Sequence, residues 1–332
     1  MYWSNFLHIY QPPNQVKEIF DRVVNESYRP LIASLRQYPA IKINLNINAA
    51  LSEQFLEGGY TDVIEGIRFA AERGQIEFTD SAKYHALLPF LPEDEIRRQI
   101  ELNRATNRQI FGPAYAPVGF FPPEMAYAPN LAPILADMGY QWIIIDEIAL
   151  NGKVNQTDAT VLYTIRGTNL LVFFRERNPS NLIMSAVVRS HETLHDAMRE
   201  DLKSGRYLVT AMDGETFGHH RPGLEKMLFD IFDTPDFNLI RISDIPSHFN
   251  KTVEIIPTRS TWASSTSDIE KGTQFLSWSD PTNDIHAKQK ELTDLVLKEV
   301  KKLNINKESY PDLRHKMDVG LASDQFFWAS AK

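Results

Sequence analysis

Short apolar runs along the chain predict the strands of a sheet. Residues 41–48 alternate strictly between apolar and polar side chains, which predicts a strand with Asn44, Asn46 and Asn48 on one face. Residues 141–145 are almost continuously apolar, which is typical of a strand buried on both faces. Further strands are predicted at residues 6–10, 75–79 and 182–188. Two more are predicted directly before Glu124 and directly before Asp213, and a hairpin is predicted at 161–165 and 170–174.

Helical periodicity fills the stretches between these strands. Pro92 with the acids that follow it is typical of a first helical turn, and Gly74 and Gly139 are typical residues after a last turn. The predicted helices cover residues 16–35, 64–73, 92–110, 131–138, 191–203, 224–232 and 285–303. The recurring order of strand and helix predicts a parallel α/β architecture.

The composition narrows the classes of partner. The chain has 332 residues, a net charge of −8 and dispersed Lys and Arg, so we expect no nucleic-acid partner. No apolar stretch approaches the roughly 18 residues of a membrane span, so we expect no membrane partner. The first residues lack the basic start and apolar core of a signal peptide, and cysteine is absent. We therefore expect a cytoplasmic protein without disulfides or thiolate metal sites.

Five residues share a position at or near the end of a predicted strand: His8, Glu77, Glu124, Asp146 and Asp213. The carboxyl ends of the strands are where an α/β barrel presents its catalytic groups. One such residue is often only a helix cap or a surface ion pair, but five would converge on one rim of a barrel. No G-x-G-x-x-G or phosphate-loop pattern is present, so we expect no nucleotide cofactor.

Two carboxylates from distant parts of a chain are what glycosidic bond cleavage requires. A retaining glycosidase places an ionised nucleophile and a protonated acid roughly 5–5.5 Å apart. Glu124 follows Pro122 and Pro123, which stiffen its backbone and suit a nucleophile that must be aimed. Asp213 has Glu215 two residues away, and a nearby negative charge would raise the pKa of Asp213 and favour a proton donor.

The chain resembles glycoside hydrolase family 57 over roughly residues 4–290. Four ordered segments carry the resemblance: His8-Ile9-Tyr10-Gln11-Pro12, Gly74-Gln75-Ile76-Glu77, Gly119-Phe120-Phe121-Pro122-Pro123-Glu124 and Asp213-Gly214-Glu215-Thr216-Phe217-Gly218. Ser260-Thr261-Trp262 is the nearest match to a fifth segment, and residues 278–286 form a second signature close by.

The resemblance implies an incomplete (β/α)7 TIM-like barrel that acts on α-glucans with retention of configuration. It implies Glu124 as the nucleophile and Asp213 as the general acid/base. We expect the remaining site residues to bind substrate: His8, Gln11, Glu77, His85, Asp146, Glu215, His219, His220 and Trp262. The expected activity is that of an α-amylase or a 4-α-glucanotransferase, which differ in whether water or a second sugar accepts the glycosyl group.

The expected organisation is one catalytic barrel over residues 1–283, followed by a helical C-terminal extension over residues 284–332. The aromatic segment Phe326-Phe327-Trp328 is expected either to pack on the barrel or to mark the cut edge of a longer helical region.

Two alternatives stay open at this point. One is a glucan-binding barrel without activity, although both acids are present. The other is a zinc enzyme of the carbohydrate deacetylase or mannosidase type. His191-Glu192-Thr193-Leu194-His195 also matches the H-E-x-x-H pattern of zinc proteases, which needs a cleft and a third ligand. His219 and His220 are adjacent and cannot easily share one ion, so we expect no metal site.

Overall fold

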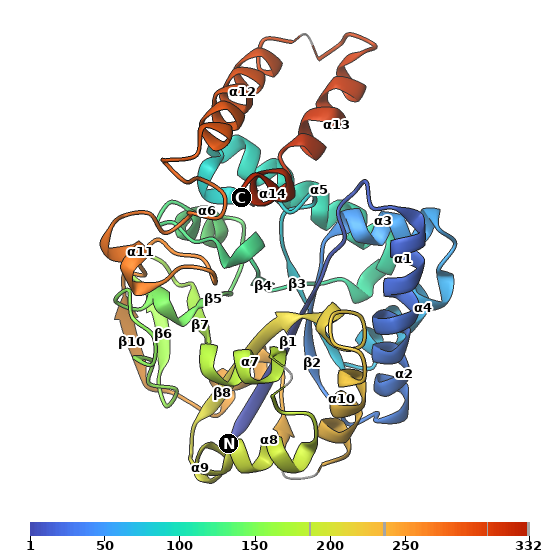
Figure 1. Cartoon of the computed structure of the whole chain (residues 1–332), viewed down its shortest axis with the longest axis vertical. Helices are drawn as coiled ribbons and strands as arrows, with labels where there is room; N and C mark the ends of the chain where they lie inside the picture. Colours follow the sequence, from blue (N-terminus) through green and yellow to red (C-terminus); the bar gives the residue numbers. More distant parts are fainter. Residues whose placement is uncertain (186, 235–236, 304, 331–332) are drawn as a thin grey trace.

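The strands form one curved sheet, which the computed structural model describes within residues 1–185, 187–234, 237–303 and 305–330 (Figure 1). Those strands are β1 (Tyr2–Ile9), β2 (Ile43–Ile47), β3 (Ile76–Asp80), β4 (Gly119–Phe120), β5 (Trp142–Asp146), β6 (Leu162–Ile165), β7 (Leu171–Arg175), β8 (Tyr207–Asp213), β9 (Asn238–Leu239) and β10 (Thr252–Ile255).

Seven strands in the order β8-β1-β2-β3-β4-β5-β7 run parallel to one another. The edge strands approach each other where β7 ends, since the Glu176 amide donates to the Val209 carbonyl at 3.0 Å. β6 pairs with β7 in antiparallel fashion, and β10 extends the sheet beyond β6. The incomplete seven-stranded barrel and the hairpin predicted from the sequence are thus confirmed.

Helices cover the outer face of the sheet (Figure 1). The main ones are α1 (Lys17–Val23), α2 (Arg29–Gln37), α3 (Ala49–Glu57), α4 (Thr61–Glu72), α5 (Glu93–Phe111), α6 (Leu131–Asp137), α7 (Arg177–Met184), α8 (His191–Ala197), α9 (Arg199–Lys203), α10 (Leu224–Asp233) and α11 (Thr266–Glu270). A π-helical turn, Val24–Tyr28, joins α1 to α2 without a break.

The main apolar core lies between the sheet and α1, α2, α4 and α10, where Leu7, Leu45 and Ile47 of the strands are buried. Each such side chain stabilises the fold by roughly 1.5–3 kcal/mol relative to an exposed one. A second core fills the barrel interior below the site around Phe6 and Phe121. Gly119 allows β4 to approach β5, because a Cβ there would lie 2.1 Å from the Trp142 indole.

Most predicted elements are present with shifted ends, but two predictions are wrong. Residues 182–188 do not begin as a strand, because α7 continues to Met184; residue 186 lies outside the described residues. Pro179 lies in the first turn of α7, which proline favours, and the helix buries Ser180 and Ile183. The helix predicted over 191–203 divides into α8 and α9 at Met198. The helix predicted over 64–73 is present as α4, which starts three residues earlier at Thr61, and α3 before it was not predicted.

Three helices follow the barrel strands near the end of the chain: α12 (Asp284–Val300), α13 (Tyr310–Gly320) and α14 (Asp324–Ala329). α12 and α13 project away from the sheet as a pair, and α14 returns to the barrel (Figure 1). Buried ion pairs join α13 to α5: Arg314 bonds Glu95 at 2.9 Å, and Asp318 bonds Arg98 at 2.6 Å. This attachment fixes where Ser323 and Asp324 enter the barrel mouth.

Candidate active site

Glu124 lies in a strained turn directly after β4. Its backbone has φ 61° and that of Met125 has φ 48°, both in the left-handed region that side chains rarely adopt. Such residues cost on the order of 1–3 kcal/mol each and collect at functional sites. Hydrogen bonds on either side hold the turn: Phe121 bonds the Asp80 carbonyl at 2.9 Å, and Trp262 bonds the Glu124 carbonyl at 3.2 Å.

Three side chains contact the Glu124 carboxyl group. The Trp262 indole Nε1–H donates to Oε2 at 2.9 Å, and Ser323 Oγ lies 3.3 Å from Oε1. His85 Nδ1 lies 3.7 Å from the same oxygen. Burial, together with the charge of Asp213, raises the pKa of Glu124 to about 8, although the Trp262 donor opposes the rise. Indole can only donate, so it favours the ionised carboxylate.

Asp213 is the last residue of β8 and is paired in register with His8 of β1. Within the described residues, no group donates a hydrogen bond to its carboxyl oxygens. Burial raises the pKa of Asp213 to about 6, and the positive charge of Arg175 opposes the rise. A carboxyl group that is not engaged by the protein is free to exchange a proton with a ligand.

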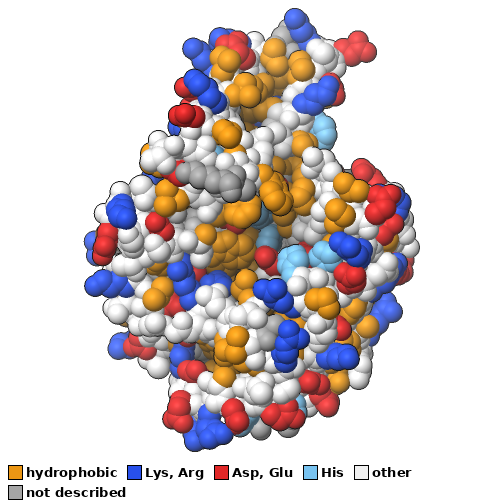
Figure 2. Space-filling view, in the orientation of Figure 1, with side chains coloured by type: hydrophobic (Ala, Val, Ile, Leu, Met, Phe, Trp, Pro, Cys, Tyr) orange, Lys and Arg blue, Asp and Glu red, His pale blue; other side chains and the backbone are white. Residues whose placement is uncertain are grey.

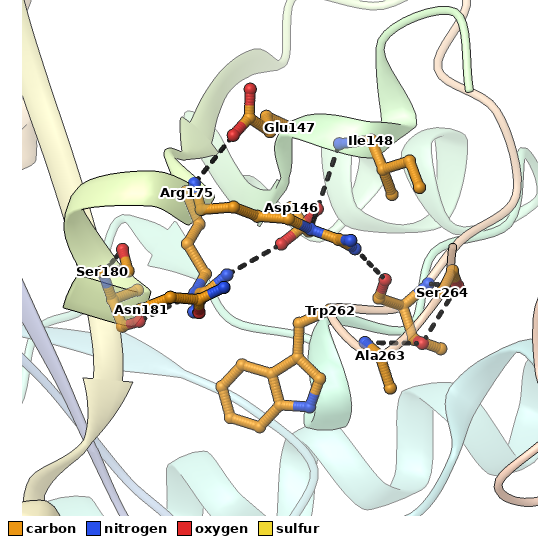
Figure 3. A network of polar contacts seen from close by, with 12 residues as sticks. Asp146, Glu147, Ile148, Arg175, Ser180, Asn181, Trp262, Ala263 and Ser264 are labelled. Atoms are coloured by element: carbon orange, nitrogen blue, oxygen red, sulfur yellow. Dashed lines mark hydrogen bonds and ion pairs between the residues drawn. The ribbon is translucent and has the colours of Figure 1, made fainter. Parts of the chain in front are cut away.

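Arg175 ends β7 and is held in a buried network (Figure 3). Its guanidinium bonds Asp146 at 3.0 Å, Asn181 at 2.7 Å and the Ala211 carbonyl at 2.8 Å. Asp146 also accepts from Arg177 at 2.7 Å and is fully buried. The expectation that Asp146 binds substrate is therefore corrected: both its oxygens are occupied, and it orients the arginine that faces Asp213.

Glu215 approaches the site from the turn after β8. It accepts a hydrogen bond from the Tyr10 amide at 3.1 Å and a short one from the Tyr28 hydroxyl. Burial, together with the charge of Asp213, raises the pKa of Glu215 to about 8. Glu124, Asp213 and Glu215 therefore form a buried group of acids whose pKa values are all raised toward neutral pH.

His8 and His85 stack and contact each other beside Glu124. Their Nε2 atoms are 3.1 Å apart, and the Tyr10 ring stacks on His85 at 4.2 Å. Burial lowers the pKa of His8 to about 4, and burial lowers the pKa of His85 as well, so both imidazoles are neutral at pH 7. His85 also has a left-handed backbone, with φ 56°.

Two cavities of about 350 and 210 Å³ share Glu124, Asp213, Trp262 and Asp324 as lining residues. The smaller is polar and is also lined by His8, Tyr10, Gln11, His85, Glu215 and His220. The larger is also lined by Arg175, Asn181, Met184, Ala263, Trp278 and Phe327. Figure 2 shows the hollow in the middle of one face, with hydrophobic side chains around it and acids and histidines within it.

Two more expected site residues lie outside these cavities. Glu77 is the second residue of β3, far from the carboxyl end of that strand, and it accepts from the Ser243 amide at 3.1 Å. It bonds a loop rather than facing the cavities, so the expected sugar contact is corrected. His219 points to Glu26, with Nδ1 2.6 Å from the carboxylate, whereas its neighbour His220 lines the cavity.

Part of the site comes from the end of the chain and was not predicted from the sequence. Asp324 lines both cavities and accepts from the Tyr10 hydroxyl at 2.6 Å. Phe327 lines the larger cavity beside Trp278. The aromatic segment at 326–328 was the sequence feature that could have predicted this part of the site, because Phe327 of that segment lines the larger cavity. Tyr10, Arg175, Asn181 and Met184 were also missed.

The described residues contain no group of three or more His, Cys, Asp or Glu side chains placed to hold a metal ion. His191 and His195 of the H-E-x-x-H pattern lie on α8, away from Glu124 and Asp213, beside a separate hollow with Asp230 and Asp233. No helix in the described part of the chain is long and apolar enough to cross a membrane.

The model of Glycosyl hydrolase family 57 matches residues 4–252. The chain belongs to this family. It is 26% identical to the α-amylase of Pyrococcus horikoshii over 313 residues, which cover 90% of this chain and 46% of that protein. The chain spans less than half the length of the curated relatives it matches.

Solved structures of the family share the fold. The 4-α-glucanotransferase of Thermococcus litoralis superposes with a TM-score of 0.71 at 20% identity, covering 99% of this chain and 48% of that one. A branching enzyme of the family from Thermococcus kodakaraensis superposes with a TM-score of 0.75 at 18% identity, covering 99% of this chain and 86% of that one. These likenesses confirm the barrel.

The raised pKa values predict how stability depends on pH. Glu124 is protonated in the fold up to about pH 8, whereas in the unfolded chain it ionises above its ordinary value of 4.5. The folded state then binds more protons, so stability falls as pH rises from about 4.5 to 8. Calorimetric unfolding temperatures of Glu124→Gln should fall less steeply over this range than those of the wild type. Glu57→Gln, an exposed control, should keep the wild-type slope; equal slopes for all three proteins would contradict the prediction.

Trp262→Phe should lower turnover roughly 10- to 100-fold while preserving the fold. The ring stays, but the indole N–H that stabilises the Glu124 carboxylate is lost. The acidic limb of the pH–rate profile should move to higher pH, because activity needs ionised Glu124. Trp328→Phe is the control, since that indole is 70% exposed and lines neither cavity. An equal effect in both variants would show that the indole donor of Trp262 has no special role.

Proposed function

We propose that this chain cleaves α-glucosidic bonds with retention of configuration. The observation that carries the proposal is that Glu124 and Asp213, from separate strands of one barrel, line the same two cavities. Two carboxyl groups with different surroundings are the requirement for such a reaction. Family membership and relatives named α-amylase and 4-α-glucanotransferase support an α-glucan as the substrate.

The roles follow from what each carboxyl group contacts. Glu124 has the Trp262 indole donor aimed at one of its oxygens and a rigid backbone, which suit a nucleophile that attacks the anomeric carbon. No donor among the described residues engages Asp213, which can protonate the leaving oxygen. A β-glycosyl ester on Glu124 results. Asp213, now ionised, takes a proton from water or from a sugar hydroxyl, which then attacks the ester and restores the α configuration.

The pKa values of the pair run opposite to these roles, with Glu124 at about 8 and Asp213 at about 6. Two close carboxyl groups share one proton. Reaction therefore requires that this proton reside on Asp213 when the sugar is bound. A sugar oxygen beside Asp213 supplies an acceptor there, while the Trp262 donor favours the charge on Glu124.

The cavities suggest how the substrate is divided. The smaller cavity offers His8, Gln11 and Glu215 to sugar hydroxyls, which fits the sugar that becomes bonded to Glu124. The larger cavity offers Trp278 and Phe327, whose rings suit stacking on the sugars of the leaving group or of an acceptor. How well an acceptor sugar competes with water there decides between hydrolysis and transfer. The cytoplasmic location stays a prediction.

The test is to incubate the protein with maltoheptaose and follow the products by chromatography. Hydrolysis gives a net gain of reducing ends, whereas transfer redistributes chain lengths without that gain. Proton NMR of the first products should show the α anomer. Inactivity on every α-linked glucan tried, with a correctly folded protein, would overturn the proposal and favour a binding protein.

A further inference from the structure

A chain of four hydrogen-bonded side chains leads from β2 to the carboxyl group of Glu124. We call it the Asn46 chain; its members are Asn46, His8, His85 and Ser323. The contacts are 2.8 Å from Asn46 Oδ1 to His8 Nδ1, 3.1 Å between the two Nε2 atoms, and 2.8 Å from His85 Nδ1 to Ser323 Oγ. The last member lies 3.3 Å from Glu124 Oε1.

The position of each proton follows from the first member. Asn46 Nδ2 lies 3.1 Å from the Thr79 hydroxyl and 3.4 Å from the Thr79 carbonyl. The hydroxyl can accept and the carbonyl can only accept, so Oδ1 faces His8 and accepts from Nδ1–H. A neutral His8 then has no proton on Nε2, so His85 must donate from its own Nε2.

The same reasoning reaches Ser323. With its proton on Nε2, a neutral His85 has an acceptor at Nδ1, and this acceptor takes the only hydroxyl hydrogen of Ser323. The serine oxygen then presents a lone pair to Glu124 Oε1. That contact is favourable when Glu124 carries a proton and donates it, and unfavourable when Glu124 is ionised.

We propose that the Asn46 chain holds the shared proton of the catalytic pair on Glu124 in the resting enzyme. This assignment rests on the proposed function of the pair. The members of the chain act through Ser323 as positioning residues rather than as reactants, and no proton leaves the chain. The consequence is a resting site that is poised in the wrong protonation state for attack until substrate binding moves the proton to Asp213.

Packing keeps the chain in one arrangement. His8 stacks on Phe121 at 4.7 Å and His85 on Tyr10 at 4.2 Å, so neither ring can turn over freely. The titratable and charged groups that line the two cavities with Glu124 are His8, Tyr10, His85, Arg175, Asp213, Glu215, His220 and Asp324. The low pKa of both histidines agrees with their neutral forms.

Ser323→Ala tests the proposal through the sign of a pH shift. If the hydroxyl oxygen accepts from protonated Glu124, its loss should move the acidic limb of kcat/KM about one pH unit lower, which raises the relative rate at low pH about tenfold. If the hydroxyl instead donates to ionised Glu124, the limb should move higher. The substrate is α-maltosyl fluoride, whose leaving group needs no acid, so the limb reports Glu124. Ser323→Thr, which keeps the hydroxyl, should keep the limb where the wild type has it.

Two NMR measurements test the chain without relying on activity. ¹⁵N spectra at high pH should show His8 in the Nδ1–H form and His85 in the Nε2–H form. A ¹³C carboxyl titration should give Glu124 a lower pKa in Ser323→Ala than in the wild type. The opposite histidine forms, or a raised or unchanged pKa of Glu124 in Ser323→Ala, would overturn the proposal. An inactive wild type with the expected spectra would instead count against the proposed function.

Discussion

Glu124→Gln should lower turnover of maltoheptaose by roughly 10,000-fold or more, because the proposed nucleophile is removed and an amide cannot form the covalent bond. The amide has the shape of the carboxyl group and can still accept from Trp262. The fold should remain, and its unfolding temperature near pH 8 should rise, because a buried acid that repels Asp213 is removed.

The backbone of Glu124 allows a second test of the same role. Its φ of 61° is one that glycine adopts without strain, so Glu124→Gly should fold and leave space where the carboxyl group was. Azide entering that space should attack α-maltosyl fluoride and yield a β-glycosyl azide, identified by NMR. Rescue of rate without any β product would show that azide acts elsewhere.

Glu77→Gln is the matched control for these variants. Glu77 is also a largely buried acid whose pKa burial raises, but it bonds Ser243 and lines neither cavity. Its substitution should leave turnover per folded molecule close to that of the wild type. A loss comparable to that of Glu124→Gln would restore the sugar contact first expected for Glu77.

The sequence predicted the barrel because its strands carry strong local signals. The strict alternation of residues 41–48 placed Asn46 on the same face as Asn44 and Asn48, and the structure shows Asn46 bonded to His8. Acids directly after apolar runs made Glu124 and Asp213 candidates, and both line the two cavities. These signals depend only on neighbouring residues in the sequence, so they can be interpreted without knowing how the chain packs.

The same signals could not tell which strand-end acid faces the cavities. Asp146 follows its strand as Asp213 does, but two arginines enclose it. Glu77 lies at the opposite end of β3, a difference of three residues that hydrophobic periodicity does not resolve. Asp324 lies 200 residues from Glu124 and enters through the ion pairs of α13 with α5, which no local pattern encodes.

Asp213→Asn should separate substrates by their leaving groups. Turnover of maltoheptaose should fall roughly 1,000-fold, because its leaving oxygen must be protonated. The attack of Glu124 on α-maltosyl fluoride should be slowed far less, since fluoride departs without a proton. The second step still lacks a base to activate water, so the glycosyl ester on Glu124 should accumulate.

The structure makes this separation sharp. Within the described residues nothing donates to the Asp213 carboxyl group, so substitution by Asn leaves no donor unpaired. Burial raises the pKa of Asp213 to about 6, against the opposing charge of Arg175. A burst of fluoride followed by a slow phase, with mass spectrometry showing the sugar on the peptide of Glu124, would identify the acid/base. Azide, which needs no base, should then release the ester.

Asp324→Asn is the comparison, because Asp324 lines both cavities but is engaged by Tyr10, so its loss should affect the two substrates alike. Equal losses on both substrates in Asp213→Asn would mean that Asp213 binds the sugar without transferring a proton.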